Sequence, residues 1–175
     1  MARRQERRDQ GRREALERAL ERLEAGNREE FTPVLAEDLF FHDHADLVRG
    51  LGEALERSGL AEACQALARH LEEDRDHWLR RLERIQAEPA LRARKAELEA
   101  DYLELLTGHF RRWGAAGAYG ERVAELEAGL LLAALRGAER LWVKGRGRPV
   151  LPVLMQEALG VVWPALYAHA RRYGK

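Results

Sequence analysis

Hydrophobic residues recur along most of the chain at intervals of three, four and seven positions, a spacing that places them on one face of an α-helix. Glycine and proline interrupt this pattern and divide it into about seven segments. The segments expected to be helical cover about residues 5–25, 32–40, 45–57, 60–88, 91–113 and 121–143, and a final one after Pro149 that passes Leu166. The pattern predicts an all-α fold, a multi-helix bundle.

The last two helices carry more apolar surface than one small bundle can hide. Residues 128–135 are apolar all round, which predicts burial on every side. Pro164 is expected to kink the final helix. The excess apolar surface predicts an isologous homodimer. The residues expected at its interface are Leu130, Ala134, Leu141, Leu154, Leu159, Trp163 and Leu166.

Composition supports the helical interpretation and limits the class of protein. The 175 residues include 28 Leu and 28 Ala but only one Ile and two Thr, so strong helix formers are common and β-branched strand formers are scarce. No apolar run approaches the roughly 18–20 residues that span a bilayer, so we expect a soluble cytoplasmic protein. The single cysteine, Cys64, excludes an intrachain disulfide and a zinc site with two or more Cys ligands.

The net charge of zero conceals segregated charges. Residues 1–13 hold six arginines against two acidic residues, a local charge of +4, whereas residues 28–46 hold one basic residue against six acidic ones, or −5. An arginine-rich arm suits phosphate oxygens, which predicts contact with nucleic acid. The alternative is a solvated helix start whose arginines pair with the glutamates that follow.

One histidine and carboxylate face has the residue types that bind metals. His70, Asp74 and His77 lie at i, i+4 and i+7 of the expected 60–88 helix, beside Glu73, and His109 lies on the following helix. A metal-carboxylate bundle needs matching ligands on its other helices, which this chain lacks. The alternative is a solvated face on which these carboxylates pair with Arg and His neighbours. We therefore expect no metal and no cofactor.

Catalysis has no candidate, whereas a ligand pocket has several. Ser58 is the only serine and no nucleophile motif surrounds it, so we do not expect an enzyme. Aromatic and polar residues on the two central helices have the composition of a small-molecule pocket. The candidates for ligand binding are His70, His77, Trp78, Tyr102, His109, Phe110 and Trp113. The alternative is that the aromatic residues at helical spacing simply fill the core.

Three stretches in the C-terminal two-thirds carry a resemblance to a known family. They are FRRWGAAG at 110–117, LLLAALRGAERLW at 130–142 and VWPAL at 162–166, and RREALERAL at 12–20 matches the family's first helix. Together they resemble the TetR/AcrR family of bacterial transcriptional regulators. The resemblance implies a homodimer with a DNA-binding unit at residues 1–46 and a ligand-binding and dimerisation domain at 47–175, which responds to a small apolar effector.

The chain departs from this family where the family reads DNA. FTPVLAE at 31–37 looks like the start of the helix-turn-helix and LFFHDH at 39–44 like its exit, with about eight residues missing between them. The acidic charge there repels phosphate. The resemblance implies DNA contacts from Arg3, Arg4, Arg7, Arg8, Thr32 and His42. The alternatives are a relative that has lost DNA binding and acts through a ligand or protein partner, and the metal-carboxylate bundle.

Overall fold

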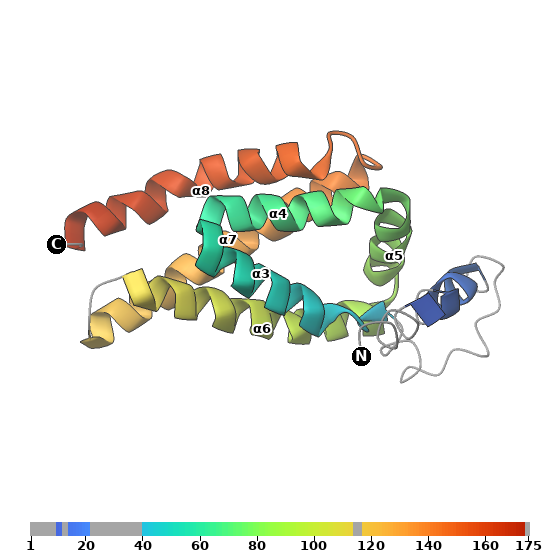
Figure 1. The fold of residues 1–175 in the computed structure, drawn as a ribbon, viewed down its shortest axis with the longest axis horizontal. Coiled ribbons are helices and arrows are strands. Elements are labelled where there is room, and N and C mark those ends of the chain that lie inside the picture. The colour runs from blue at the N-terminus through green and yellow to red at the C-terminus, as the bar shows by residue number, and fades with distance from the viewer. Residues whose placement is uncertain (1–9, 12–13, 22–39, 114–116, 174–175) are drawn as a thin grey trace.

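The computed structural model describes residues 10–11, 14–21, 40–113 and 117–173, and for 113, 117–119 and 167–173 the backbone only (Figure 1). The described residues form helices joined by short turns, without a strand among them. The predicted all-α multi-helix fold is therefore confirmed. No helix in this part of the chain is long and apolar enough to cross a membrane.

Most helices lie where the hydrophobic pattern predicts them. Part of the first is described at 10–11 and 14–21. The others are α3 at His44–Ser58, α4 at Leu60–Glu73, α5 at Arg75–Ala87, α6 at Pro89–Trp113, α7 at Gly117–Lys144 and α8 at Leu151–Tyr173. The expected domain boundary after residue 46 falls in the first turn of α3, and Leu16 and Phe40 belong to the same core as the later helices.

The single long helix expected at 60–88 is wrong, because the chain turns at Asp74. The backbone angles there, φ −121° and ψ 50°, are not helical, and α4 ends where α5 begins. The turn lets the two helices bury their apolar faces against different neighbours. Cys64 and Ala68 of α4 are buried where α4 packs on α3 and α8, whereas Trp78 and Ile85 of α5 are buried where α5 packs on α6.

The helices share one hydrophobic core. α7 and α8 pack against each other as a hairpin and contribute residues to this core. Figure 1 shows α8 running beside α4, α6 on the opposite side of the molecule, and α5 closing one end between them. Complete burial of residues 128–135 is also wrong. Ala128 and Leu131 are fully buried, but Leu130 is 40% exposed, because one face of α7 points away from the other helices.

Candidate ligand-binding site

A cavity of about 140 Å³, partly open to solvent, lies between the helices of the body. Leucine is the commonest residue of its lining and comes from α3, α4, α5, α6 and α7, and the beginning of α8 adds Leu151 and Met155. Each of these five helices contributes at least one leucine, namely Leu51, Leu67, Leu82, Leu106 and Leu132 in chain order. Such a wall favours an apolar molecule, because binding removes hydrocarbon surface from water.

The cavity also has a charged wall in which each cation is paired with a carboxylate. Lys95 of α6 pairs with Glu139 of α7, and Arg136 of α7 pairs with Glu99 of α6. All four residues line the cavity. The two pairs cross between the same two helices in opposite directions, so they join α6 to α7 and leave this part of the wall without net charge.

Arg81 is the most buried charged residue of the site. It lies on α5, is 2% exposed, and donates from Nη1 and Nη2 to the two carboxylate oxygens of Asp43, at 2.8 and 2.6 Å. Nη2 also donates to the backbone carbonyl of Phe40. The guanidinium carbon lies 4.4 Å from the ring centroid of Trp78, a cation–π contact. Arg81 therefore joins the cavity wall to the turn that precedes α3.

Asp43 stays ionised beside this arginine. Burial alone would raise the pKa of its carboxyl, but the hydrogen bonds and charge of Arg81 outweigh burial and lower that pKa below its ordinary value. The fork geometry of two parallel bonds is the arrangement in which an Arg–carboxylate pair is strongest. The pair thus links α5 to the residue that directly precedes α3.

Tyr102 and His44 add polar groups that are held in place. His44 Nε2 lies 2.8 Å from Oδ2 of Asp101, and the His44 ring meets the Tyr102 ring edge-on at 5.3 Å. Both His44 and Tyr102 line the cavity. Burial, together with the negative charge of Asp43, raises the pKa of the Tyr102 phenol, so this side chain stays neutral.

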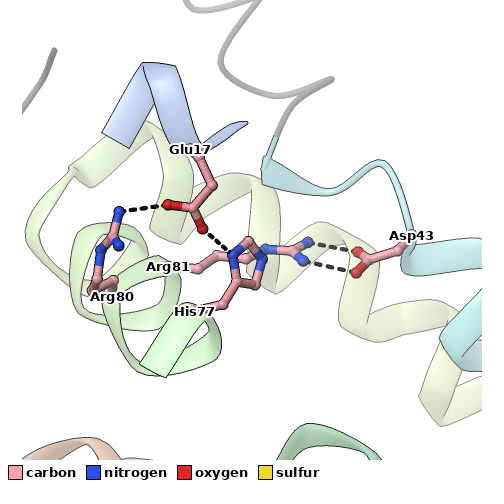
Figure 2. A network of polar contacts seen from close by, with 5 residues as sticks. All are labelled: Glu17, Asp43, His77, Arg80 and Arg81. Atoms are coloured by element: carbon pink, nitrogen blue, oxygen red, sulfur yellow. Dashed lines mark hydrogen bonds and ion pairs between the residues drawn. The ribbon is translucent and has the colours of Figure 1, made fainter. Parts of the chain in front are cut away.

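The opposite side of α5 holds the first helix. Figure 2 shows Glu17 between His77 and Arg80, with Arg81 pointing the other way to Asp43. Oε1 of Glu17 lies 2.5 Å from Nδ1 of His77, and Oε2 accepts from Nη2 of Arg80 at 2.7 Å. The hydrogen bond with His77 is the main reason that the pKa of Glu17 lies below its ordinary value. One helix thus contacts both the cavity and the N-terminal segment.

Two of the predicted ligand-binding residues line this cavity and four described ones lie elsewhere. Trp78 and Tyr102 are in its wall, whereas His70 lines a neighbouring groove between α3 and α4. His77 bonds to Glu17 instead. His109 is buried on α6 outside the cavity, and burial lowers the pKa of its imidazole.

Phe110 packs against the core outside the cavity, and the side chain of Trp113 lies outside the described residues. The charged residues of the cavity wall were not among those predicted from the sequence. One signal was available: Arg81 lies three residues after Trp78 and four before Ile85, so it is a charged residue on the apolar face of its helix.

The residues of the alternative metal-carboxylate face are divided between two helices. Because the chain turns at Asp74, the residues His70 and His77 lie on two different helices. Within the described ranges, no three His, Cys, Asp or Glu side chains are grouped as metal ligands. Nδ1 of His70 lies instead 3.8 Å from Oε2 of Glu73, and both side chains are exposed to solvent.

The predicted DNA contacts fall mainly outside the described part of the chain. Arg3, Arg4, Arg7, Arg8 and Thr32 all lie there. His42 is described, and its half-buried side chain lines the groove between α3 and α4.

The predicted interface residues divide into three groups by their exposure. Leu154, Leu159 and Leu166 are buried inside the chain's own core, because this face of α8 packs on α4 and α7. Their predicted place at a dimer interface is therefore wrong. Ala134 and Trp163 are half-buried. Leu130 and Leu141 remain exposed, at 40% and 55%. Further large apolar side chains that are exposed on the α7–α8 hairpin are Leu126, Val153 and Val161.

No model of a known protein family matches the chain, and no curated protein and no solved structure does so either. The resemblance to TetR-type regulators therefore depends on the short motifs alone.

Proposed function

We propose that this chain is a homodimeric, TetR-like transcriptional regulator whose helical body binds a small apolar effector. The observation that carries the proposal is the leucine-lined cavity at the centre of the body, one wall of which is α5. A regulator needs its ligand site to contact the element that the ligand moves.

Helix α5 meets that requirement in two places. Trp78 and Arg81 line the cavity, while His77 and Arg80 hold the first helix through Glu17. Arg81 also holds the turn at Phe40 and Asp43. A ligand that shifts α5 would therefore change the position of the N-terminal segment, to which the resemblance assigns DNA binding.

The α7–α8 hairpin supports the dimer part of the proposal. Leu126, Leu130 and Leu141 follow one another at helical spacing on the exposed face of α7, and Val153 and Val161 are exposed on α8. Several large apolar side chains exposed on one hairpin are typical of a surface that a partner covers. A second copy, packed hairpin to hairpin, would cover it.

DNA binding is the decisive test of the regulatory part. We expect the chain to retard a DNA fragment from upstream of its own gene in a gel at low salt, and to bind it more weakly when the salt concentration is raised. The double variant Arg3→Ala/Arg4→Ala should weaken binding at low salt. Arg140→Ala/Arg148→Ala removes the same charge from exposed positions near the α7–α8 turn and serves as the matched control.

Failure of this test would select the alternative function. No retardation at low salt, or retardation that an unrelated fragment of equal length matches, would contradict DNA regulation. A dimeric chain that still binds apolar ligands would then be a TetR-like protein that acts through its ligand or a protein partner.

A further inference from the structure

The cavity wall holds two buried hydrogen-bond donors that no residue in the described ranges accepts from. They are Nε of Arg81 on α5 and Nε of Arg136 on α7. Buried donors without an acceptor are rare in folded proteins, because each costs the free energy of its lost hydration. Two such donors, on different helices around one cavity, favour a ligand that accepts hydrogen bonds from them.

The ion pairs fix these donors in position. Nη1 and Nη2 of Arg81 are engaged with Asp43 and Phe40, and Nη2 of Arg136 is engaged with Glu99. A guanidinium is planar, so anchoring both terminal nitrogens of Arg81 also fixes the direction of its Nε–H, and the single contact of Arg136 restricts the direction of its own. The donors are thus oriented before any ligand arrives, which reduces the entropic cost of binding.

The same ion pairs determine the charge of the ligand. The three cations of the wall, Arg81, Lys95 and Arg136, each have a carboxylate partner, so the wall is already neutral. A ligand carboxylate would bring an uncompensated charge into leucine-lined surroundings, which costs more than a single hydrogen bond returns. An uncharged oxygen acceptor avoids this cost.

The volume determines the size of the ligand. The cavity measures about 140 Å³, close to the roughly 150 Å³ of an engineered apolar cavity that binds benzene. We propose, on the basis of the ligand-binding function above, that this cavity binds a single-ring apolar molecule bearing an uncharged carbonyl oxygen, which accepts hydrogen bonds from Arg81 and Arg136.

A matched pair of probes isolates the carbonyl oxygen. Acetophenone has the required ring and carbonyl, and α-methylstyrene has the same shape with a methylene group in place of the oxygen. In calorimetric titrations of the full chain, acetophenone should bind about tenfold more tightly than α-methylstyrene, the gain from hydrogen bonds to charged donors. Benzoate, with its charge, should bind more weakly than acetophenone.

Variants then assign the preference to the two arginines. Arg136→Met keeps the aliphatic stem and removes the donors. Because 40% of the Arg136 side chain is exposed, we expect this variant to fold, with an unchanged far-ultraviolet circular dichroism spectrum. It should reduce the tenfold preference, and Arg81→Lys, which keeps the charge but moves the donor, should reduce it too. Arg80→Met is the matched control, because Arg80 precedes Arg81 on α5 but does not line the cavity.

The outcomes separate this inference from the function on which it rests. Equal binding of acetophenone and α-methylstyrene to the unaltered chain would overturn the carbonyl inference and leave the cavity as an apolar ligand site. Tighter binding of benzoate, or a preference unchanged in both arginine variants, would also overturn it. Binding of none of the three probes would contradict both the inference and the proposed ligand-binding function.

Discussion

Arg81 shows how a single buried side chain determines much of the local structure. Its charge lies in the core at 2% exposure, where an unpaired guanidinium would be costly. Asp43 compensates the charge, and Trp78 covers the guanidinium from α5 itself. The conformation of the turn before α3 therefore depends on this pair as well as on apolar contacts.

Asp43→Asn should destabilise the chain by about 2 kcal/mol at neutral pH, because it leaves the Arg81 charge buried without its partner; the 24% exposure of Asp43 keeps the loss below that of a fully buried pair. Urea unfolding measures the change. Asp46→Asn is the control, since Asp46 pairs with Arg49 at the surface, and it should change stability by less than about 0.5 kcal/mol. Equal losses in the two variants would contradict the role of burial.

The same pair predicts a pH dependence with a definite sign. The pKa of Asp43 is lowered in the folded state, so its stabilising contribution is complete above the ordinary value of 3.8 and is lost as the pH falls through the folded pKa. The stability difference between the unaltered chain and Asp43→Asn should therefore be constant from pH 7 to about 5 and shrink below pH 4. A difference that grows on acidification would contradict this assignment.

Gly147, in the turn between α7 and α8, is required by its conformation and by its neighbours. Its φ is +80°, and a Cβ there would lie 2.8 Å from Cδ of Arg75. Gly147→Ala should lower the unfolding free energy by about 1 kcal/mol or more. Gly129→Ala, in the interior of α7 with no atom within 4 Å of the added carbon, should instead raise it by up to about 1 kcal/mol. Thermal or urea unfolding of the two variants compares them directly.

At the scale of helices, α5 is the element that joins two parts of the chain. Its neighbours on one side are the cavity residues, and on the other side Glu17 accepts from His77 and Arg80. Glu17→Gln weakens both contacts because it removes the charge, so the helical backbone at 14–21 should exchange its amide hydrogens faster, with little change in α6. Glu14→Gln, on the same helix with an exposed bond to Gln10, is the control. Unchanged exchange at 14–21 would contradict the role of Glu17.

The sequence predicted α3, α6 and α7 to within a few residues, because apolar periodicity and the flanking Gly and Pro are local signals. The turn at Asp74 has no such signal, since neither Gly nor Pro lies there. It depends on tertiary contacts: Glu72 accepts from the backbone nitrogen of Leu151 at the start of α8, 79 positions away. A contact between residues so far apart in the chain does not alter the hydrophobic periodicity of the sequence.

The candidate site was predicted only in its aromatic part, for the same physical reason. Trp78 and Tyr102 have the residue types and helical spacing of a pocket wall, and both lie in it. The pairing of Arg81 with Asp43, and of Lys95 with Glu139, joins residues 38 and 44 positions apart. In a chain with 60 charged residues of balanced sign, composition alone does not indicate which charges will meet.

At the scale of the whole molecule, the proposed function uses two different surfaces, the cavity wall and the exposed face of the α7–α8 hairpin. In that proposal the cavity of the bundle binds the ligand, and the exposed face of the α7–α8 hairpin binds a second copy. The most exposed of its large side chains are Leu126, at 73%, and Val161, at 79%. Because the two surfaces lie on opposite faces of α7, a change in one is expected to leave the other intact.

Sedimentation tests the dimer and this independence together. The chain should sediment at micromolar concentration with about twice the 20.0 kDa mass of one copy. Leu126→Asp/Leu130→Asp places two charges on the exposed face of α7 and should yield monomers, because burying them against a partner would cost several kcal/mol. Leu103→Asp, which places one such charge at a 37% exposed leucine of α6, should leave the dimer intact.

The monomeric variant then separates assembly from ligand binding. It should retain the helical circular dichroism spectrum and bind acetophenone as the dimer does, because the cavity is formed within one copy. DNA retardation should fall steeply, since two half-sites can no longer be bound by one particle. A monomeric mass for the unaltered chain, or dimers that persist in Leu126→Asp/Leu130→Asp, would contradict the assignment of this face to the interface.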